Sequence, residues 1–370
     1  MKLLVTGGAG FIGSNLVRYL LKKSSSELGL EITRVVNLDK LTYAGNRSSL
    51  RDLDEDSRHI FVAGDICDAD LVGRLLREHQ IDAVMHLAAE SHVDRSIDNP
   101  EDFIQTNFVG TYRLLEAFRH YLAEKGWGPT SAKSLKDGAK HVFLHVSTDE
   151  VYGSLGPEES AFSETSSYLP NNPYSASKAG GDHLARAYHR TYGMPIVTTN
   201  CANNYGPYQF PEKLLPLMIL KTLRGESLPV YGDGQQVRDW LYVEDHCRGL
   251  AMAMVGGVFG ETYMIGGRCE MRNIDVVHAI IDALRELAPE RGLKTAGELI
   301  TYVEDRPGHD RRYAIDTQRI EREFGWQPRV DFASGLRRTV QWYLSNLDWI
   351  DDIESGNYRG ERLGTIRLEG

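Results

Sequence analysis

The stretch KLLVTGGAGFIGSNLVRYL, from Lys2 to Leu20, decides the fold. An apolar run at Lys2–Thr6 leads into a turn with glycines at positions 7, 10 and 13, followed by an amphipathic helix predicted at Gly10–Leu21. Glycines at this spacing allow a tight turn, a close approach of backbone to a diphosphate, and close packing of helix on strand. The unpaired N–H groups and positive end of the helix then favour a phosphate-bearing ligand at the turn.

Strand and helix patterns alternate through the first half of the chain. Further strands are predicted at Thr33–Leu38, His59–Ala63, Ala83–Leu87, His141–Ser147 and Pro195–Asn200. Further helices are predicted at Asp70–Glu78, Asn99–Tyr121 and Tyr174–Tyr192. This alternation predicts an α/β fold with a doubly wound parallel sheet, the Rossmann arrangement, covered by helices on both faces.

After Tyr205 the alternation gives way to Pro- and Gly-rich segments such as Gly232-Asp233-Gly234. We expect a dinucleotide-binding domain at residues 1–205, completed by about residues 235–260. A smaller C-terminal α/β domain that binds the substrate is expected mainly at residues 206–347, with loops that close over the ligand. Residues 348–370 are assigned to a C-terminal tail, and its polar, Gly-rich part from about Asp351 is expected to be frayed.

Composition narrows the class of function. The 370 residues exceed the usual size of one hydrophobic core, and the net charge of -10 argues against a nucleic-acid or anionic membrane partner. The four cysteines have no metal-ligand spacing, so we expect reduced thiols in or near the core and no metal, with a catalytic or disulfide role as the alternative. The chain begins directly with a strand and has no long apolar span, which predicts a cytoplasmic protein.

Acidic and small residues follow the predicted strands where a dinucleotide would lie. Asp39 ends the second strand, where its carboxylate can bind both ribose hydroxyls and would repel a 2′-phosphate, so it favours NAD over NADP. Its spacing from Gly13 is long, which we assign to a polar insertion at Ser24–Glu31; an aspartate that merely caps a turn is the alternative. Asp65 and Ile66 are placed to meet the adenine edge.

Tyr174 and Lys178 are four residues apart and therefore share one face of a helix. A tyrosine ionises near pKa ~10, too high for a base at neutral pH. We expect the neighbouring lysine and a positively charged nicotinamide to lower the pKa of Tyr174, so that it can accept a hydroxyl proton. Ser147 and Thr148, at the end of a preceding strand, support the same site.

Asp149 and Glu150 follow directly in the segment STDEVYG, Ser147–Gly153. Two adjacent carboxylates are unnecessary for hydride transfer alone. An elimination needs such a pair, because one group removes a carbon-bound proton and another protonates the departing hydroxyl. The alternative is that both are solvated loop carboxylates.

From Met1 to about Leu347 the chain resembles the extended short-chain dehydrogenase/reductase family, which carries this glycine turn, the Tyr/Lys pair and a Ser/Thr partner. Within it, the segment Ser147–Gly153 is similar to a motif of the nucleotide-sugar 4,6-dehydratases that act on dTDP-glucose. Further matches are Leu38–Gly45, Ala88–Asp94, Asn200–Pro207 and Asp305–His309.

This resemblance implies a lyase that removes water from dTDP-glucose to give dTDP-4-keto-6-deoxyglucose, with bound NAD regenerated in each turnover. Tyr174 would deprotonate the 4-hydroxyl, hydrogen-bonded by Thr148, as C4 is oxidised. Glu150 would then remove the C5 proton, Asp149 would protonate the C6 hydroxyl as water leaves, and hydride would return to C6.

The resemblance also implies the contact residues. For the cofactor these are Gly7, Gly10, Phe11, Ile12, Gly13, Asp39, Lys40, Leu41, Thr42, Asp65, Ile66, Leu87, Ala88, Ala89, Ser91, Thr106, Ser147, Tyr174, Lys178 and Asn204. For the substrate they are Ser91, Thr148, Glu150, Asn203, Lys213, Leu214, Pro229, Tyr231, Arg238, Asn273, Arg306 and His309.

Arg238 and Arg306 suit the substrate diphosphate because a guanidinium binds phosphate oxygens in a bidentate manner, with surface ion pairs as the alternative. The family also suggests a homodimer built from the helices at Asn99–Tyr121 and Tyr174–Tyr192. The chain departs from the family in a Gly/Ser/Lys-containing loop at Gly126–Lys140.

Three other functions compete with this interpretation. A sugar-nucleotide 4-epimerase needs the same cofactor and Tyr/Lys pair but no proton shuttle, so Asp149 and Glu150 count against it. A GDP-mannose dehydratase is expected to use NADP, which Asp39 disfavours. A non-catalytic NAD-sensing regulator would often lack the Tyr/Lys pair. The sequence leaves the nucleotide and the downstream pathway open.

Overall fold

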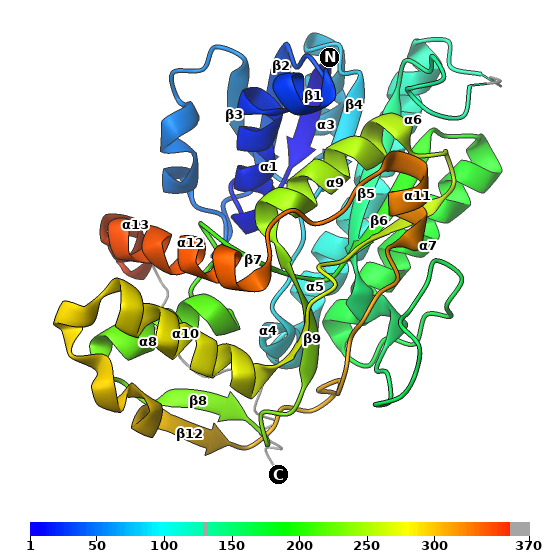
Figure 1. Ribbon diagram of the computed structural model, residues 1–370. Coiled ribbons are helices and arrows are strands. Elements are labelled where there is room, and N and C mark those ends of the chain that lie inside the picture. Colours follow the sequence, from blue (N-terminus) through cyan, green and yellow to red (C-terminus); the bar gives the residue numbers. More distant parts are fainter. Residues whose placement is uncertain (129–131, 356–370) are drawn as a thin grey trace.

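A seven-stranded parallel sheet forms the larger part of the molecule (Figure 1). The computed structural model describes residues 1–128 and 132–355. The strand order is β10-β6-β5-β4-β1-β2-β3, and every neighbouring pair is parallel. The strands are β1 Lys2–Thr6, β2 Arg34–Asp39, β3 His59–Ala63, β4 Ala83–His86, β5 Val142–Thr148, β6 Ile196–Cys201 and β10 Thr262–Ile265.

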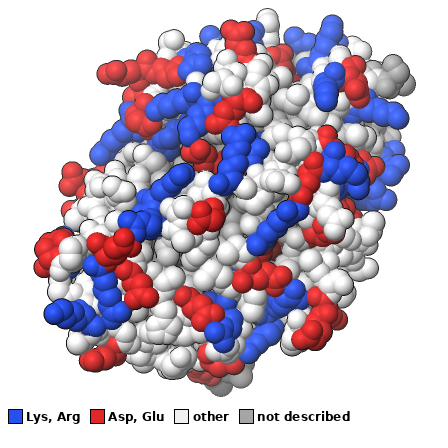
Figure 2. Space-filling model, in the orientation of Figure 1, with Lys and Arg blue, Asp and Glu red and all other residues white. Residues whose placement is uncertain are grey.

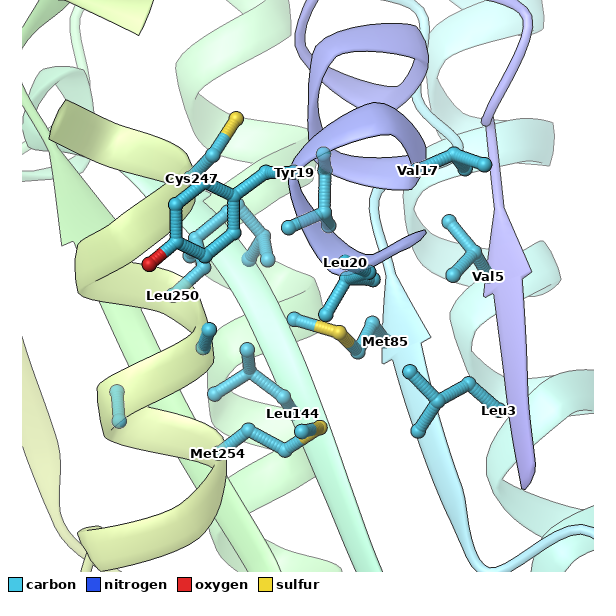
Figure 3. Packing of buried hydrophobic residues seen from close by; sticks show 14 of the residues in the cluster. Leu3, Val5, Val17, Tyr19, Leu20, Met85, Leu144, Cys247, Leu250 and Met254 are labelled. Carbon is cyan, nitrogen blue, oxygen red and sulfur yellow. The ribbon is translucent and has the colours of Figure 1, made fainter. Parts of the chain in front are cut away.

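Helices cover both faces of this sheet, as a parallel sheet requires. One face packs against α1 Phe11–Lys22 and α9 Val243–Gly256, where Leu20 and Leu250 meet Leu3, Met85 and Leu144 of the strands (Figure 3). The other face packs against α3 Ala69–Glu78, α6 Thr111–Glu124 and α7 Pro173–Tyr192. The predicted doubly wound α/β fold is confirmed, and each of the six strands predicted from the sequence begins and ends within one residue of an observed one.

A smaller set of elements packs beside the carboxyl ends of the sheet (Figure 1). Its strands are β7 Asn203–Tyr205, β8 Leu228–Tyr231, β9 Val237–Tyr242, β11 Glu270–Arg272 and β12 Ile300–Val303. Its helices are α8 Leu214–Arg224, α10 Asn273–Leu287, α12 Phe332–Ser345 and α13 Leu347–Glu354. They share a separate hydrophobic core that includes Ile219, Ile280 and Val340.

Shorter elements connect these parts. They are α2 Ser24–Leu28, α4 Val93–Asp98, α5 Pro100–Phe103 and α11 Gln318–Phe324, a π-helix at Ile104–Gly110, and 3-10 helices at Arg47–Leu53, Asp149–Tyr152, Pro289–Arg291 and Leu293–Leu299. The helix predicted at Asn99–Tyr121 is thus α5, the π-helix and α6 in succession. The buried Asn107 side chain accounts for the π-helix, because it bonds both the N–H and the C=O of Glu90 at 2.9 Å, away from the helix axis.

The frayed tail predicted from about Asp351 is wrong for its first part, because α13 continues to Glu354. The helix α13 buries Trp349, Ile350 and Ile353 in the second core, so apolar residues spaced at i, i+1 and i+4 outweigh the polar residues between them. Residues 356–370 of the predicted tail lie outside the described residues, as do residues 129–131 of the loop at Gly126–Lys140.

The described helices include none that is both long and apolar enough to cross a membrane. Acidic and basic side chains are interspersed over the face seen in Figure 2 and form no broad region of one sign there.

Candidate active site

The glycine turn between β1 and α1 is a cradle that side chains would fill. Gly7 has φ +74°, and a Cβ there would lie 2.6 Å from the backbone nitrogen of Ala88. A Cβ on Gly13 would lie 2.1 Å from the carbonyl oxygen of Gly7, within the same turn. Helix α1 begins at Phe11, so its first N–H groups face the space above the turn. This geometry fits the diphosphate of a dinucleotide.

Asp39 stands at the end of β2 beside this turn. Its two oxygens accept hydrogen bonds from the N–H groups of Ala9 and Leu41, both at 2.8 Å. Burial raises the pKa of Asp39, and these two N–H donors oppose the rise. Each oxygen keeps a lone pair for a ribose hydroxyl. A Cβ on Gly45 would lie 2.7 Å from Asp39 Oδ1, so a glycine there keeps the carboxylate accessible.

A cleft runs from the glycine turn across the carboxyl ends of β1, β4 and β5, the place where doubly wound sheets bind ligands. Every residue that the resemblance implied for the cofactor lines it, except Leu41, which contributes its N–H to Asp39. The implied substrate contacts Ser91, Thr148, Glu150, Asn203 and Lys213 line it too.

The cleft also has lining residues to which the sequence interpretation assigned no contact. They include Gly45, Gly64, Glu90, Gln209 and Glu212. Gly45 and Glu90 lie inside the matched segments Leu38–Gly45 and Ala88–Asp94, which is the signal that would have found them. Gln209 and Glu212 lie beyond any matched segment.

The catalytic helix α7 begins beside this cleft with a strong cap. The Asn172 side chain accepts the N–H of Ser175 at 2.9 Å, the Ser175 hydroxyl receives the N–H of Asn172, and Pro173 occupies the first helical position. Tyr174 and Lys178 therefore lie in the first turns of the helix and face the cleft.

The predicted lowering of the Tyr174 pKa involves both Lys178 and a positively charged nicotinamide, and it stays a prediction. Lys178 Nζ donates to the carbonyl oxygen of Val146 at 2.8 Å. Burial, followed by the charge of Glu150, raises the pKa of Tyr174 well above its ordinary value, while a hydrogen bond with Thr148 opposes the rise. Tyr174 is therefore a protonated phenol here, and it needs added positive charge in the cleft to become a base.

The two adjacent carboxyl groups have different surroundings. Asp149 is 1% exposed; its Oδ1 accepts the Thr148 hydroxyl at 3.3 Å, and its Oδ2 has no partner among the described residues. Burial and the charge of Glu150 raise the pKa of Asp149 well above its ordinary value. This carboxyl is suited to donate a proton.

Three cations surround Glu150. Burial raises the pKa of Glu150, but Arg306, Lys213 and Arg238 all oppose that rise. Burial thus raises the pKa of both carboxyl groups, that of Asp149 well above its ordinary value, while Glu150 has three cations nearby that favour its ionised form. Two carboxyl groups with such different surroundings are the arrangement that assigns acid and base roles.

Arg238 carries a buried charge without a carboxylate partner among the described residues. Its guanidinium donates to the carbonyl oxygens of Val237 and Asp310, at 2.8 and 2.9 Å, and lies 4.3 Å from the ring centroid of Tyr313. It is 5% exposed. Such a charge remains available for an anionic ligand.

Arg306 is paired instead with a protein carboxylate. Its Nη1 lies 2.7 Å from Asp94 Oδ1, and the Tyr231 hydroxyl donates to Asp94 Oδ2 at 2.9 Å. His309 Nδ1 lies 2.5 Å from Asp305 Oδ1, and burial with the charges of Arg306 and Arg238 lowers the pKa of His309 to about 4.

The remaining implied substrate contacts surround the second core. Leu214 begins α8, Pro229 lies in β8 and Asn273 begins α10. With Tyr231, Arg238, Arg306 and His309, they do not line the main cleft. The amide oxygens of Asn203, Asn204 and Asn273 are buried and have no partner among the described residues, so each is an acceptor available to a ligand.

A doubly wound sheet with a glycine cradle, a helix-borne Tyr/Lys pair and a Thr at the end of β5 defines a short-chain dehydrogenase/reductase. The model of one family in this class, described as GDP-mannose 4,6 dehydratase, matches residues 4–339, and the chain belongs to that family.

Individual relatives give a finer comparison. The chain is 55% identical to dTDP-glucose 4,6-dehydratase 1 of Escherichia coli K12, with 97% of each chain covered. It is similar to the crystal structure of DesIV, a dTDP-glucose 4,6-dehydratase from Streptomyces venezuelae with NAD bound, at TM-score 0.84 and 47% identity, covering 95% of this chain and 100% of that one. A UDP-glucose 4-epimerase from Thermus thermophilus in complex with NAD has TM-score 0.76 and 30% identity, with 94% and 100% covered.

Proposed function

We propose that the chain is an NAD-dependent hydro-lyase that converts dTDP-glucose into dTDP-4-keto-6-deoxyglucose and water. The observation that carries the proposal is the buried Asp149, whose pKa is raised by burial, next to Glu150 in the same cleft as Tyr174 and Lys178. The relatives at 55% identity, named dTDP-glucose 4,6-dehydratases, support the choice of substrate.

The glycine cradle, Asp39 and Lys178 would hold the dinucleotide, and bound NAD⁺ supplies the reversible redox chemistry within one turnover. Its positive ring would also lower the pKa of Tyr174, which the chain alone leaves high. Tyr174 then accepts the proton of the 4-hydroxyl, and the Thr148 hydroxyl orients that oxygen. Glu150 removes the C5 proton, which a ketone at C4 acidifies. Asp149 protonates the C6 hydroxyl as water departs.

A 4-epimerase shares the fold, and two observations separate it from the proposed reaction. An epimerase needs no group that protonates a departing hydroxyl, so a buried acid in the cleft, such as Asp149, favours the elimination. The second observation is sequence identity over the whole chain. The chain is 30% identical to the epimerase and 55% identical to a dehydratase relative, which favours the dehydratase substrate. Asp39 favours NAD over the NADP expected for a GDP-mannose dehydratase.

The proposal is tested by incubating the purified protein with NAD and a panel of nucleoside-diphosphate hexoses, and analysing the products by mass spectrometry. We expect loss of one water from dTDP-glucose. In deuterated water the product should carry deuterium at C5, with the C4 hydrogen moved to C6. A product of unchanged mass with an inverted C4 centre would establish an epimerase instead.

We propose further that the protein forms a homodimer and resides in the cytoplasm. Ile104, Phe108 and Tyr112 are 38–46% exposed and are spaced four residues apart, and Tyr192 on α7 is 51% exposed. Such an exposed apolar surface favours association. The four free thiols suit a reducing compartment. Sedimentation equilibrium of wild type and Phe108→Glu tests the dimer, since a monomeric wild type would contradict it.

A further inference from the structure

The catalytic helix carries a second buried charge that the proposed mechanism does not use. Asp182 lies one turn beyond Lys178 on α7, so the two side chains leave the same face of the helix. Asp182 is 4% exposed. Gly181 lets α7 approach β5 closely, because a Cβ there would lie 3.1 Å from the carbonyl oxygen of Asn107 and 3.4 Å from the His145 ring.

Three donors from three segments hold the Asp182 carboxylate. His145 Nε2 on β5 lies 2.9 Å from Oδ1, and the Tyr168 hydroxyl and Asn200 Nδ2 donate to Oδ2 at 2.9 and 3.2 Å. Burial alone would raise the pKa of Asp182, but the His145 hydrogen bond and the charges of His145 and Lys178 bring it below its ordinary value. Asp182 is therefore a buried carboxylate with its hydrogen bonds satisfied.

This network extends to two groups of the reaction. The Asn200 amide that binds Asp182 also donates to the carbonyl oxygen of Thr148, at 3.0 Å, and so joins the carboxylate to the residue that would orient the 4-hydroxyl. On the other side, Lys178 reaches only a neutral carbonyl, that of Val146, and forms no ion pair within the described part of the chain. Its ammonium needs a negative charge nearby to remain protonated.

Burial disfavours a charge on the other titratable groups around Lys178. Burial lowers the pKa of His86, and it also lowers that of His145 against the opposing bond from Asp182. Burial raises the pKa of the Cys201 thiol. For Lys178 itself, burial lowers the pKa and the charge of Asp182 is the main opposing influence.

We propose that Asp182 is a positioning residue for the reaction, the buried counter-charge that keeps Lys178 protonated and, through Asn200, fixes Thr148. Because it concerns the groups that activate Tyr174, this inference rests on the proposed function.

The test measures the protonation of Lys178 directly. Protein labelled with ¹³C at lysine Cε is titrated by NMR without substrate, and the Lys178 signal is identified by its absence from Lys178→Arg. Asp182→Asn keeps the shape of the side chain and removes its charge, so we expect the Lys178 midpoint to fall by about one pH unit or more. The matched control, Tyr168→Phe, removes one hydrogen bond and keeps the charge, so its midpoint should stay near that of wild type.

A second measurement does not depend on the folding of Asp182→Asn. In wild type labelled at aspartate Cγ, with the signal assigned by its absence from Asp182→Glu, the Asp182 carboxyl should shift at the Lys178 midpoint. The proposal is overturned if that step is missing, if Asp182→Asn leaves the midpoint unchanged, or if Tyr168→Phe lowers it equally. Since no substrate is present, these outcomes are independent of whether dTDP-glucose is turned over.

For turnover we expect the alkaline limb of the pH profile, followed by the absorbance of reduced cofactor on substrate addition, to move to lower pH in Asp182→Asn. An unchanged limb in a folded variant contradicts the proposal. An inactive wild type would count against the proposed function alone.

Discussion

Three single residues at the end of β5 carry the chemistry proposed for the cleft. Thr148, Asp149 and Glu150 are consecutive, yet each side chain meets a different environment: a hydrogen-bonding partner, a buried site, and a group of cations. Because consecutive residues at a strand end point in different directions, a short motif can place three distinct functions around one substrate.

Glu150→Gln separates oxidation from elimination. The variant should bind NAD and oxidise C4, because Tyr174 and Thr148 are unchanged, but C5 exchange and water loss should fall by about 10²–10⁴-fold. Deuterium incorporation and product formation measure the two steps. Asp149→Asn is the matched variant and should keep C5 exchange while slowing water loss. Normal elimination by Glu150→Gln would show that another base acts.

Asp149→Asn also tests how the free energy of unfolding depends on pH. Burial raises the pKa of Asp149 above its ordinary value of 3.8, so the folded state holds a proton that the unfolded state releases. This contribution is complete below the unfolded pKa and is lost as the pH rises through the folded pKa. Urea denaturation from pH 4 to 8 should therefore show Asp149→Asn gaining stability relative to wild type as the pH rises. A difference that is constant with pH would contradict a buried, protonated Asp149.

For single residues, the sequence was a better guide to which residues belong to the candidate site than to their pKa values. The turn glycines and Asp39 were predictable because their chemistry depends on local backbone and a strand end. The pKa of Tyr174 was not, because it depends on how deeply α7 is buried and on Lys178 bonding Val146, a residue 32 positions away.

Among the elements, α7 connects local sequence to catalysis most directly. The helix begins at Pro173 because Asn172 caps it and a proline favours the first helical position. Both residue types are known start signals that the sequence contains. The π-helix at Ile104–Gly110 is the opposite case, because Asn107 bonds Glu90 from another segment and no local pattern marks that contact.

Asn172→Ala should cost about 1 kcal/mol of unfolding free energy, since the first N–H groups of α7 lose their cap. It should also lower kcat, because Tyr174 lies in the first turn. Asp331→Ala removes the corresponding cap from α12, where the side chain accepts the N–H of Ser334, and should leave kcat unchanged. Urea denaturation and steady-state kinetics on both variants check this. Equal losses of kcat would show that general destabilisation, not the position of Tyr174, is responsible.

At the scale of the whole molecule, α13 packs the end of the described chain against residues much earlier in the sequence. Trp349 packs against Trp342 and Tyr208, with ring centroids 5.0 and 5.7 Å apart, and its Nε1 donates to the Ser49 hydroxyl at 3.1 Å. The sequence interpretation missed this because the polar residues Asp348, Asp351 and Asp352 mask three apolar positions whose partners lie elsewhere in the chain.

Trp349→Ala should destabilise the protein by about 3–5 kcal/mol, the usual cost of removing a large buried aromatic side chain. Ser49→Ala removes only the hydrogen bond and should cost about 1 kcal/mol. Chemical denaturation of both variants measures the difference. A loss for Trp349→Ala no larger than that for Ser49→Ala would mean that α13 is dispensable to the core.

The edge strand β10 has a consequence for synthesis on the ribosome. It pairs with β6, whose last residue is Cys201, yet β10 ends only at Ile265, after β7, α8, β8 and β9 of the smaller set of elements have been made. Until then the nascent sheet exposes the unpaired backbone of β6, and until α9 has been made it also lacks that helix over one apolar face, a state prone to aggregation. Translation speed between residues 202 and 265 thus bears on the yield of folded protein, and a chain truncated after residue 205 would keep that exposed edge permanently.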